Sequence, residues 1–187
     1  MKNNKKNIVV YCSSRENIPQ EHKDCAALLG EWIGKNGHSL VYGGVHAGLM
    51  SITAQATHDN EGEVIGVIPE MFLYRRSSLN DILITTMDLN ERKMVMIDRG
   101  DVYVVLPGGI GTLDEWLATL SHNLSIGSQK KLVIVNLDGI FDYQIKQLEA
   151  TSDSPFAHGN IMERMVIVSS AEEMLQSLTQ IVESNIE

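Results

Sequence analysis

Short apolar runs alternate with helix-like segments along the whole chain. Runs rich in Val and Ile predict buried strands, and they fall at residues 8–11, 40–42, 64–68, 82–86, 102–106, 131–136 and 165–168. The segments between most of these runs predict helices. In residues 20–36, for example, Ala26, Leu29 and Ile33 recur at helical spacing. Further helices are expected to about residue 60 after a glycine loop at 43–48, over 88–100, after a second glycine loop at 107–111, over 140–150 and over 171–183.

This alternation predicts an α/β fold: a Rossmann-like, doubly wound parallel sheet of about seven strands flanked by helices. We expect residues 1–187 to form a single domain, because no linker, repeat or low-complexity segment interrupts the pattern. Residues 71–81 have no clear period and are expected to form a loop. Ligands of such sheets bind beyond the carboxyl ends of the strands. The loops expected there are 12–15, 43–48, 87–92 and 107–112.

The loop at 107–111 predicts an anion site. Gly108, Gly109 and Gly111 let the backbone approach a ligand closely. The helix that follows presents unpaired N–H groups and a partial positive charge, and Thr112 adds a hydroxyl donor. A phosphate is the most plausible ligand for such a helix N-terminus. A turn that merely needs glycine is the plainer alternative.

The same helix carries Glu115 in its first turn. Four leucines recur at helical spacing and predict the stripe that packs on the sheet: Leu113, Leu117, Leu120 and Leu124. Glu115, Thr119 and His122 fall on the opposite side of this helix. The pattern therefore predicts that Glu115 faces away from the core, where a partner subunit could enclose it. Arg92 and Lys93 begin the preceding helix, where cations oppose the helix dipole, which suggests a role other than helix stability.

Composition narrows the class of partner. The net charge of -9 argues against nucleic acid and anionic membranes, which favour basic surfaces. Cys12 and Cys25 form no disulfide framework and no metal spacing, which favours a reducing cytoplasm. The apolar run after the basic residues 1–7 is too short for a signal peptide, and no stretch approaches transmembrane length.

Common catalytic and nucleotide-binding motifs are missing. Asp114 stands where a dinucleotide fingerprint needs its third glycine, and neither glycine loop carries the Gly-Lys-Ser/Thr of a P-loop. The six histidines, His158 among them, are scattered without metal spacing. No Gly-x-Ser-x-Gly elbow supports a serine triad. A pyridoxal-phosphate decarboxylase would need a Schiff-base lysine, and Lys93 and Lys131 have no supporting context.

Two motifs together resemble a known family. Residues 107–115 read Pro-Gly-Gly-x-Gly-Thr-x-x-Glu, and residues 91–93 read Glu-Arg-Lys. This combination resembles the signature of the LOG (Lonely Guy) family of cytokinin riboside 5′-monophosphate phosphoribohydrolases, which are often mislabelled as lysine decarboxylases. The similarity covers about four-fifths of the chain, and its other segments are Cys12-Ser13-Ser14, Gly43-Gly44, Gly48-Leu49-Met50, 62–69 and Asp138-Gly139.

The resemblance implies a small-molecule nucleotide substrate and no metal or organic cofactor. An adenosine-type 5′-monophosphate would be hydrolysed at its N-glycosidic bond to free base and ribose 5-phosphate. Glu115 would stabilise the sugar cation or position water, and Arg92 would assist departure of the base. The implied substrate-binding residues are Gly108, Gly109, Gly111 and Thr112 at the phosphate, with Lys93, Ser13, Ser14, Gly43 and Gly44 in support. The family is typically a homodimer with sites near the subunit contact.

The sequence also departs from the family pattern. Asn90 stands where a histidine is frequent, Val45 where a third glycine is frequent, and residues 121–124 lack the usual Trp and Gln. Residues 74–77 offer no clear match for a ribose-contacting glutamate. These positions would shape the base and ribose pocket, so the N6-substituent preference stays open. The alternative reading is a carrier that binds a nucleotide or phosphate ligand without reacting it.

Overall fold

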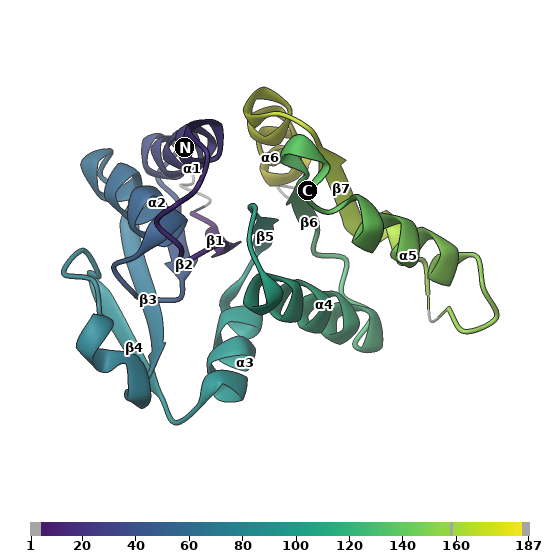
Figure 1. Ribbon diagram of the computed structural model, residues 1–187, viewed down its shortest axis with the longest axis horizontal. Coiled ribbons are helices and arrows are strands. Elements are labelled where there is room, and N and C mark those ends of the chain that lie inside the picture. The colour runs from purple at the N-terminus through teal and green to yellow at the C-terminus, as the bar shows by residue number, and fades with distance from the viewer. Residues whose placement is uncertain (1–4, 158, 185–187) are drawn as a thin grey trace.

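The computed structural model describes residues 5–157 and 159–184. The basic residues 1–4 and His158, both noted in the sequence, lie outside the described part. Seven parallel strands form one sheet in the order β4-β3-β2-β1-β5-β6-β7 (Figure 1). The strands are β1 Asn7–Tyr11, β2 Ser39–Tyr42, β3 Glu63–Pro69, β4 Ile82–Thr86, β5 Val102–Val105, β6 Leu132–Val135 and β7 Met165–Val168. The predicted doubly wound α/β fold is confirmed.

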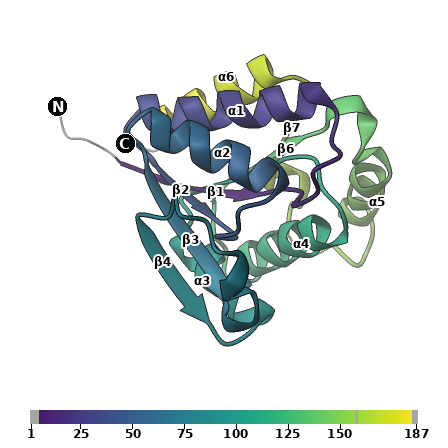
Figure 2. The same cartoon turned by 60° about the vertical axis from the view of Figure 1, so that its left-hand side comes forward.

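Helices cover both faces of the sheet (Figure 2). The α-helices are α1 Gln20–Lys35, α2 Gly48–Asp59, α3 Leu89–Arg99, α4 Ile110–Ser125, α5 Asp142–Ser152 and α6 Ala171–Ser184, and the short 3-10 helices are η1 Glu70–Arg75, η2 Leu137–Gly139 and η3 Met162–Arg164. No helix in the described residues is long and apolar enough to cross a membrane.

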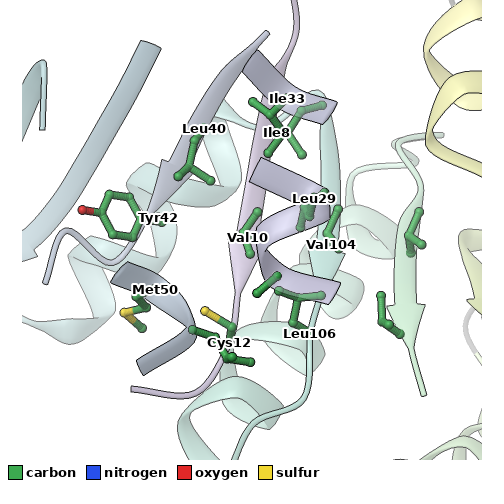
Figure 3. Packing of buried hydrophobic residues seen from close by; sticks show 14 of the residues in the cluster. Ile8, Val10, Cys12, Leu29, Ile33, Leu40, Tyr42, Met50, Val104 and Leu106 are labelled. Atoms are coloured by element: carbon green, nitrogen blue, oxygen red, sulfur yellow. The ribbon is translucent and has the colours of Figure 1, made fainter. Parts of the chain in front are cut away.

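Side chains of β1 alternate between two apolar layers, as the pleat of a strand requires. Ile8 and Val10 belong to the layer beneath α1, α2 and α6 (Figure 3). Val9 and Tyr11 belong to the layer beneath α3, α4 and α5. All four side chains are at most 1% exposed, so β1 is central to both layers.

The chain reverses its direction across the sheet at β1. It runs outward from β1 to β4 and then returns to place β5 on the other side of β1. The carboxyl ends of β1 and β5 therefore meet at the topological switch point, where ligands of this fold class bind. The predicted glycine loop follows β5 at this point.

Residues 71–81 depart from the predicted loop. Their first part belongs to the 3-10 helix η1, and Arg76 then pairs with Val45 in an antiparallel bridge. The Asn80 amide donates to the Gly44 carbonyl, and Asn80 accepts from the Tyr42 hydroxyl. Long-range contacts thus hold the segment against the β2–α2 loop. Such contacts leave no hydrophobic periodicity in the sequence, so the pattern along the chain does not reveal them.

Close approach of α1 and α2 depends on Gly30. A Cβ at this position would lie 2.4 Å from the Thr53 carbonyl oxygen of α2. We expect Gly30→Ala to lower the free energy of unfolding by about 1–3 kcal/mol, because the helices must move apart. Gly111→Ala in α4 is the matched control, since a Cβ there meets no atom within 4 Å. Equal stability of the two variants in urea titrations would contradict this account of the packing.

Candidate functional site

Backbone hydrogen bonds join three loops at the switch point. The Ser13 amide donates to the Pro107 carbonyl over 3.1 Å, which links the loops after β1 and β5. The Leu49 amide donates to the Ser13 carbonyl over 3.0 Å, which adds the start of α2. Ser13 therefore stands at the centre of three loop ends that come from distant parts of the sequence.

These loops enclose a cavity of about 350 Å³, a size typical of small-ligand sites. Seven of the residues predicted for the site line it: Ser13, Ser14, Arg92, Gly109, Gly111, Thr112 and Glu115. The other lining residues are Cys12, Arg15, Val45, Met50, Phe72, Arg75, Leu89 and Ile110. The structure thus brings most of the predicted side chains to one place.

Four predicted residues do not line the cavity: Gly43, Gly44, Lys93 and Gly108. A Cβ on Gly108 would lie 2.1 Å from the Thr112 hydroxyl oxygen, so this glycine lets the loop close onto α4. Gly43 lies close to Arg92, because a Cβ on Gly43 would be 3.6 Å from a guanidinium nitrogen of that arginine. Gly44 has a φ of +72°, which glycine adopts without strain. Lys93 contacts Asp114.

The N-terminus of α4 is open towards the cavity. Its N-cap residue is Gly109, which has no side chain to accept from the first-turn amides. A Cβ on Gly109 or Gly111 would meet no atom within 4 Å, so a ligand can reach this backbone. Thr112 is buried beside them. These features agree with the predicted anion site.

The predicted orientation of α4 is wrong. Leu117 is 43% exposed, whereas Glu115 is 4% exposed. The buried residues of the helix are Thr112, Glu115, Trp116, Thr119, Leu120 and Asn123. A leucine stripe locates the sheet-facing side of a helix only when that side is apolar, and here four of these six buried residues are polar. Glu115 is therefore enclosed by its own chain, without a partner subunit.

Polar partners allow this face of α4 to be buried. The Thr119 hydroxyl donates to the Glu115 carbonyl over 2.8 Å and shares a hydrogen bond of 2.9 Å with the Tyr11 hydroxyl on β1. Arg92 approaches from α3 and places a guanidinium nitrogen 2.6 Å from a Glu115 carboxylate oxygen. Buried polar groups are tolerated when they are paired in this way.

Two ion pairs connect the starts of α3 and α4. Asp88 caps α3 by accepting from the Asn90 and Glu91 amides. The cap fixes the first turn of α3, from which Arg92 reaches Glu115 and Lys93 reaches Asp114 over 2.8 Å. The two cations therefore compensate carboxylates of α4, which explains their unfavourable place at a helix N-terminus.

Burial makes the Glu115 carboxyl a weaker acid than an ordinary glutamate. Loss of solvation raises its pKa from 4.5 to about 7, and the neighbouring Arg92 charge only partly opposes that rise. The carboxyl can consequently exist in both protonation states near neutral pH. Such a group on a cavity wall is a candidate for general acid–base chemistry or for stabilising a cation.

Cys12 also lines the cavity, and burial raises the pKa of its thiol. A neutral thiol is a poor nucleophile, so Cys12 contributes to the lining of the cavity and not to its chemistry. Within residues 5–157 and 159–184, no three His, Cys, Asp or Glu side chains gather in a way that could hold a metal ion.

Arg15 and Arg75 are the charged cavity residues that the sequence reading did not assign. Arg15 directly follows the Ser13-Ser14 segment, so its position after a strand was an available signal. Arg75 lies in the segment predicted to be a loop. The family resemblance placed residues 74–77 near the base and ribose pocket but assigned no role to Arg75, and the fold brings η1 to the cavity.

Comparison with known proteins finds a matching family model and named relatives. A family model described as "Possible lysine decarboxylase" matches residues 50–178. Proteins named cytokinin riboside 5′-monophosphate phosphoribohydrolase from Mycobacterium tuberculosis and Mycobacterium marinum are 35% and 33% identical. Each alignment covers 91% of this chain and 91% of the relative.

A solved structure of similar fold carries a different name. The molybdenum cofactor binding protein from Rippkaea orientalis superposes with a TM-score of 0.75 at 25% identity, over 95% of this chain and 98% of that one. The same fold thus serves proteins with different named ligands. The family model and the curated relatives, each matching most of the chain, show that this protein belongs to the LOG family, the cytokinin riboside 5′-monophosphate phosphoribohydrolases.

Proposed function

We propose that this protein hydrolyses the N-glycosidic bond of adenosine 5′-monophosphates, N6-substituted or plain, to free base and ribose 5-phosphate. The observation that carries the proposal is the buried Arg92–Glu115 pair on the cavity wall, one helical turn from the N-terminus of α4. The names of the two mycobacterial relatives support the same reaction. No cofactor is part of the proposal.

The N-terminus of α4 is the proposed phosphate site. Backbone amides near Gly109 and Gly111 would donate to phosphate oxygens, assisted by the Thr112 hydroxyl and by Ser13 and Ser14 across the cavity. Local donors of this kind are necessary, because the chain carries a net charge of -9 and repels anions at long range.

Glu115 is the proposed group at the anomeric carbon. The bond to the base breaks with its electron pair leaving on the base, and the sugar develops oxocarbenium character. An ionised Glu115 stabilises that cation and accepts a proton from the attacking water as the new C–O bond forms. The proton returns to the departed base, so that water adds across the bond and the carboxylate is regenerated.

Arg92 is the proposed partner of this carboxylate. Its charge opposes protonation of Glu115, which keeps a fraction of the carboxyl ionised at neutral pH. Its Nε is buried and has no hydrogen-bond partner in the described residues, so it could donate to a substrate after a shift of the side chain. A buried donor without a partner is costly, and a bound nucleotide that accepts from it would remove that cost.

A carrier without chemistry is the second candidate. The fold similarity to a protein named for molybdenum cofactor binding favours it. The joint presence of Arg92 and Glu115 in the cavity favours the hydrolase, because phosphate binding at α4 does not need a buried carboxylate.

We further propose a homodimer and a cytoplasmic location. Exposed apolar side chains at the starts of α3 and α4 support the dimer, with Met87 77%, Ile110 84% and Leu117 43% exposed. The two cysteines, both buried and free, support a reducing compartment.

Removal of either member of the pair should abolish most of the activity. We expect Glu115→Gln and Arg92→Gln to lower turnover of AMP or isopentenyl-AMP about 10²–10⁴-fold, the usual loss for an acid–base group. Base release is measured by chromatography. Asp114→Asn, which removes a neighbouring exposed carboxylate, is the matched control and should retain most of the turnover. Wild-type-like turnover in both test variants would exclude the assignment.

The rate should depend on pH through Glu115. Because the ionised carboxylate is the active form and its pKa is about 7, turnover should rise as pH increases through 7 and then level off. Arg92 lowers this pKa, so Arg92→Gln should move the inflection to higher pH. The measurement is kcat against pH for both proteins. An inflection near 4.5, or one that stays fixed in the variant, would contradict this role.

The ionised form of the Glu115 carboxyl, which is the active form, should lower the stability of the folded protein. Its pKa is higher folded than unfolded, so the stability it contributes is present below pH 4.5 and is lost as pH rises through 7. Between these limits the loss is on the order of 1–3 kcal/mol. Glu115→Gln cannot ionise, so its free energy of unfolding relative to wild type should increase by this amount from pH 4.5 to 8. Parallel urea-derived stability curves for the two proteins would contradict the raised pKa.

A further inference from the structure

Three arginines and one glutamate line the cavity: Arg15, Arg75, Arg92 and Glu115. Arg92 and Glu115 form an ion pair of 2.6 Å and largely cancel each other. The two remaining arginines therefore give the cavity a positive charge within a chain whose net charge is -9.

Neither remaining arginine has a side-chain partner in the part of the chain that the structure describes. Across residues 5–157 and 159–184, the side chains of Arg15 and Arg75 form no ion pair and no hydrogen bond. Their backbones, in contrast, are anchored. The Arg15 amide donates to the Ser13 hydroxyl over 3.1 Å, and the Arg75 carbonyl accepts from the His46 amide over 3.0 Å. The chain thus holds two charged residues at the cavity whose guanidinium N–H groups are available to a ligand.

The sheet order separates Arg75 from the phosphate site at α4. That site follows β5, whereas η1 with Arg75 follows β3, three strands away. At ~4.8 Å per strand, the two strand ends lie roughly 14 Å apart. Arg15 follows β1, between them. Arg75 therefore stands towards the far side of the cavity from the N-terminus of α4, and Arg15 lies between them, one strand from α4 and two strands from η1.

We propose that Arg15 and Arg75 form a second anion subsite, so that the pocket accepts a nucleotide with a second phosphate in addition to the one at α4. The inference rests on the proposed function for the place of the first phosphate and of the nucleoside. The second phosphate can come from two sources: a ribose hydroxyl, as in adenosine 3′,5′-bisphosphate, or a phosphate chain, as in ADP. Guanidinium groups bind phosphate oxygens through paired, charge-assisted hydrogen bonds, which a neutral ligand could not use.

The test compares AMP, ADP and adenosine 3′,5′-bisphosphate by isothermal titration calorimetry, with each sample analysed for free adenine. Where adenine appears, the titration is repeated with Glu115→Gln. We expect at least one of the two doubly phosphorylated nucleotides to bind about tenfold or more tightly than AMP, because a hydrogen bond to a charged group contributes that much. The nucleotide that gains identifies the source of the second phosphate.

Variants assign the gain to the two arginines. In the double variant Arg15→Gln/Arg75→Gln, the affinity for the doubly phosphorylated nucleotide divided by the affinity for AMP should fall to about one. Arg76→Gln removes the same charge from the neighbouring residue, which does not line the cavity, and should keep the ratio. The subsite is excluded if neither nucleotide exceeds AMP, if the double variant keeps the ratio, or if it loses AMP and the second nucleotide equally. Absence of free adenine from every sample would exclude hydrolysis of these unsubstituted nucleotides and leave this binding result intact.

Discussion

Burial of the Glu115 carboxylate against Arg92 is the constraint on which the site depends. A carboxylate between a helix and a sheet is costly unless a cation and hydrogen-bond donors face it. Here the cation comes from α3, whose first turn is fixed by the Asp88 cap. The helix that carries Glu115 is held in turn by Thr119 and Tyr11. The incomplete compensation by Arg92 leaves the pKa of Glu115 near 7, within reach of proton transfer at neutral pH.

The topology explains why this pair lies beside an anion site. β1 and β5 are neighbours in the sheet although about ninety residues separate them, and their carboxyl ends form the switch point. The loop after β5 leads directly into α4, so the helix that presents its N-terminus to the cavity also carries Glu115 one turn later. Phosphate binding and chemistry at the sugar can thus share one rigid element, which fixes their separation.

Most of the fold could be predicted from the sequence, and seven of the eleven residues predicted for the site line the cavity. Val- and Ile-rich runs located all seven strands, and the glycine loop located the open end of α4, because these signals are local. The rotation of α4 could not be read, since Glu115 is buried by partners on β1 and α3 that are distant in sequence. Arg75 was missed for the same reason: η1 reaches the cavity through a bridge between Val45 and Arg76.

The acidity of Glu115 itself is the most direct test of this account. Carboxyl carbon NMR on ¹³C-labelled protein, with the Glu115 resonance assigned by its loss in Glu115→Gln, would follow this one group through a pH titration. The account predicts a midpoint near 7, well above the ordinary value of 4.5. A midpoint at or below 4.5 would contradict it, because Glu115 would then be an ordinary ion-pair partner of Arg92 with no proton to exchange at neutral pH.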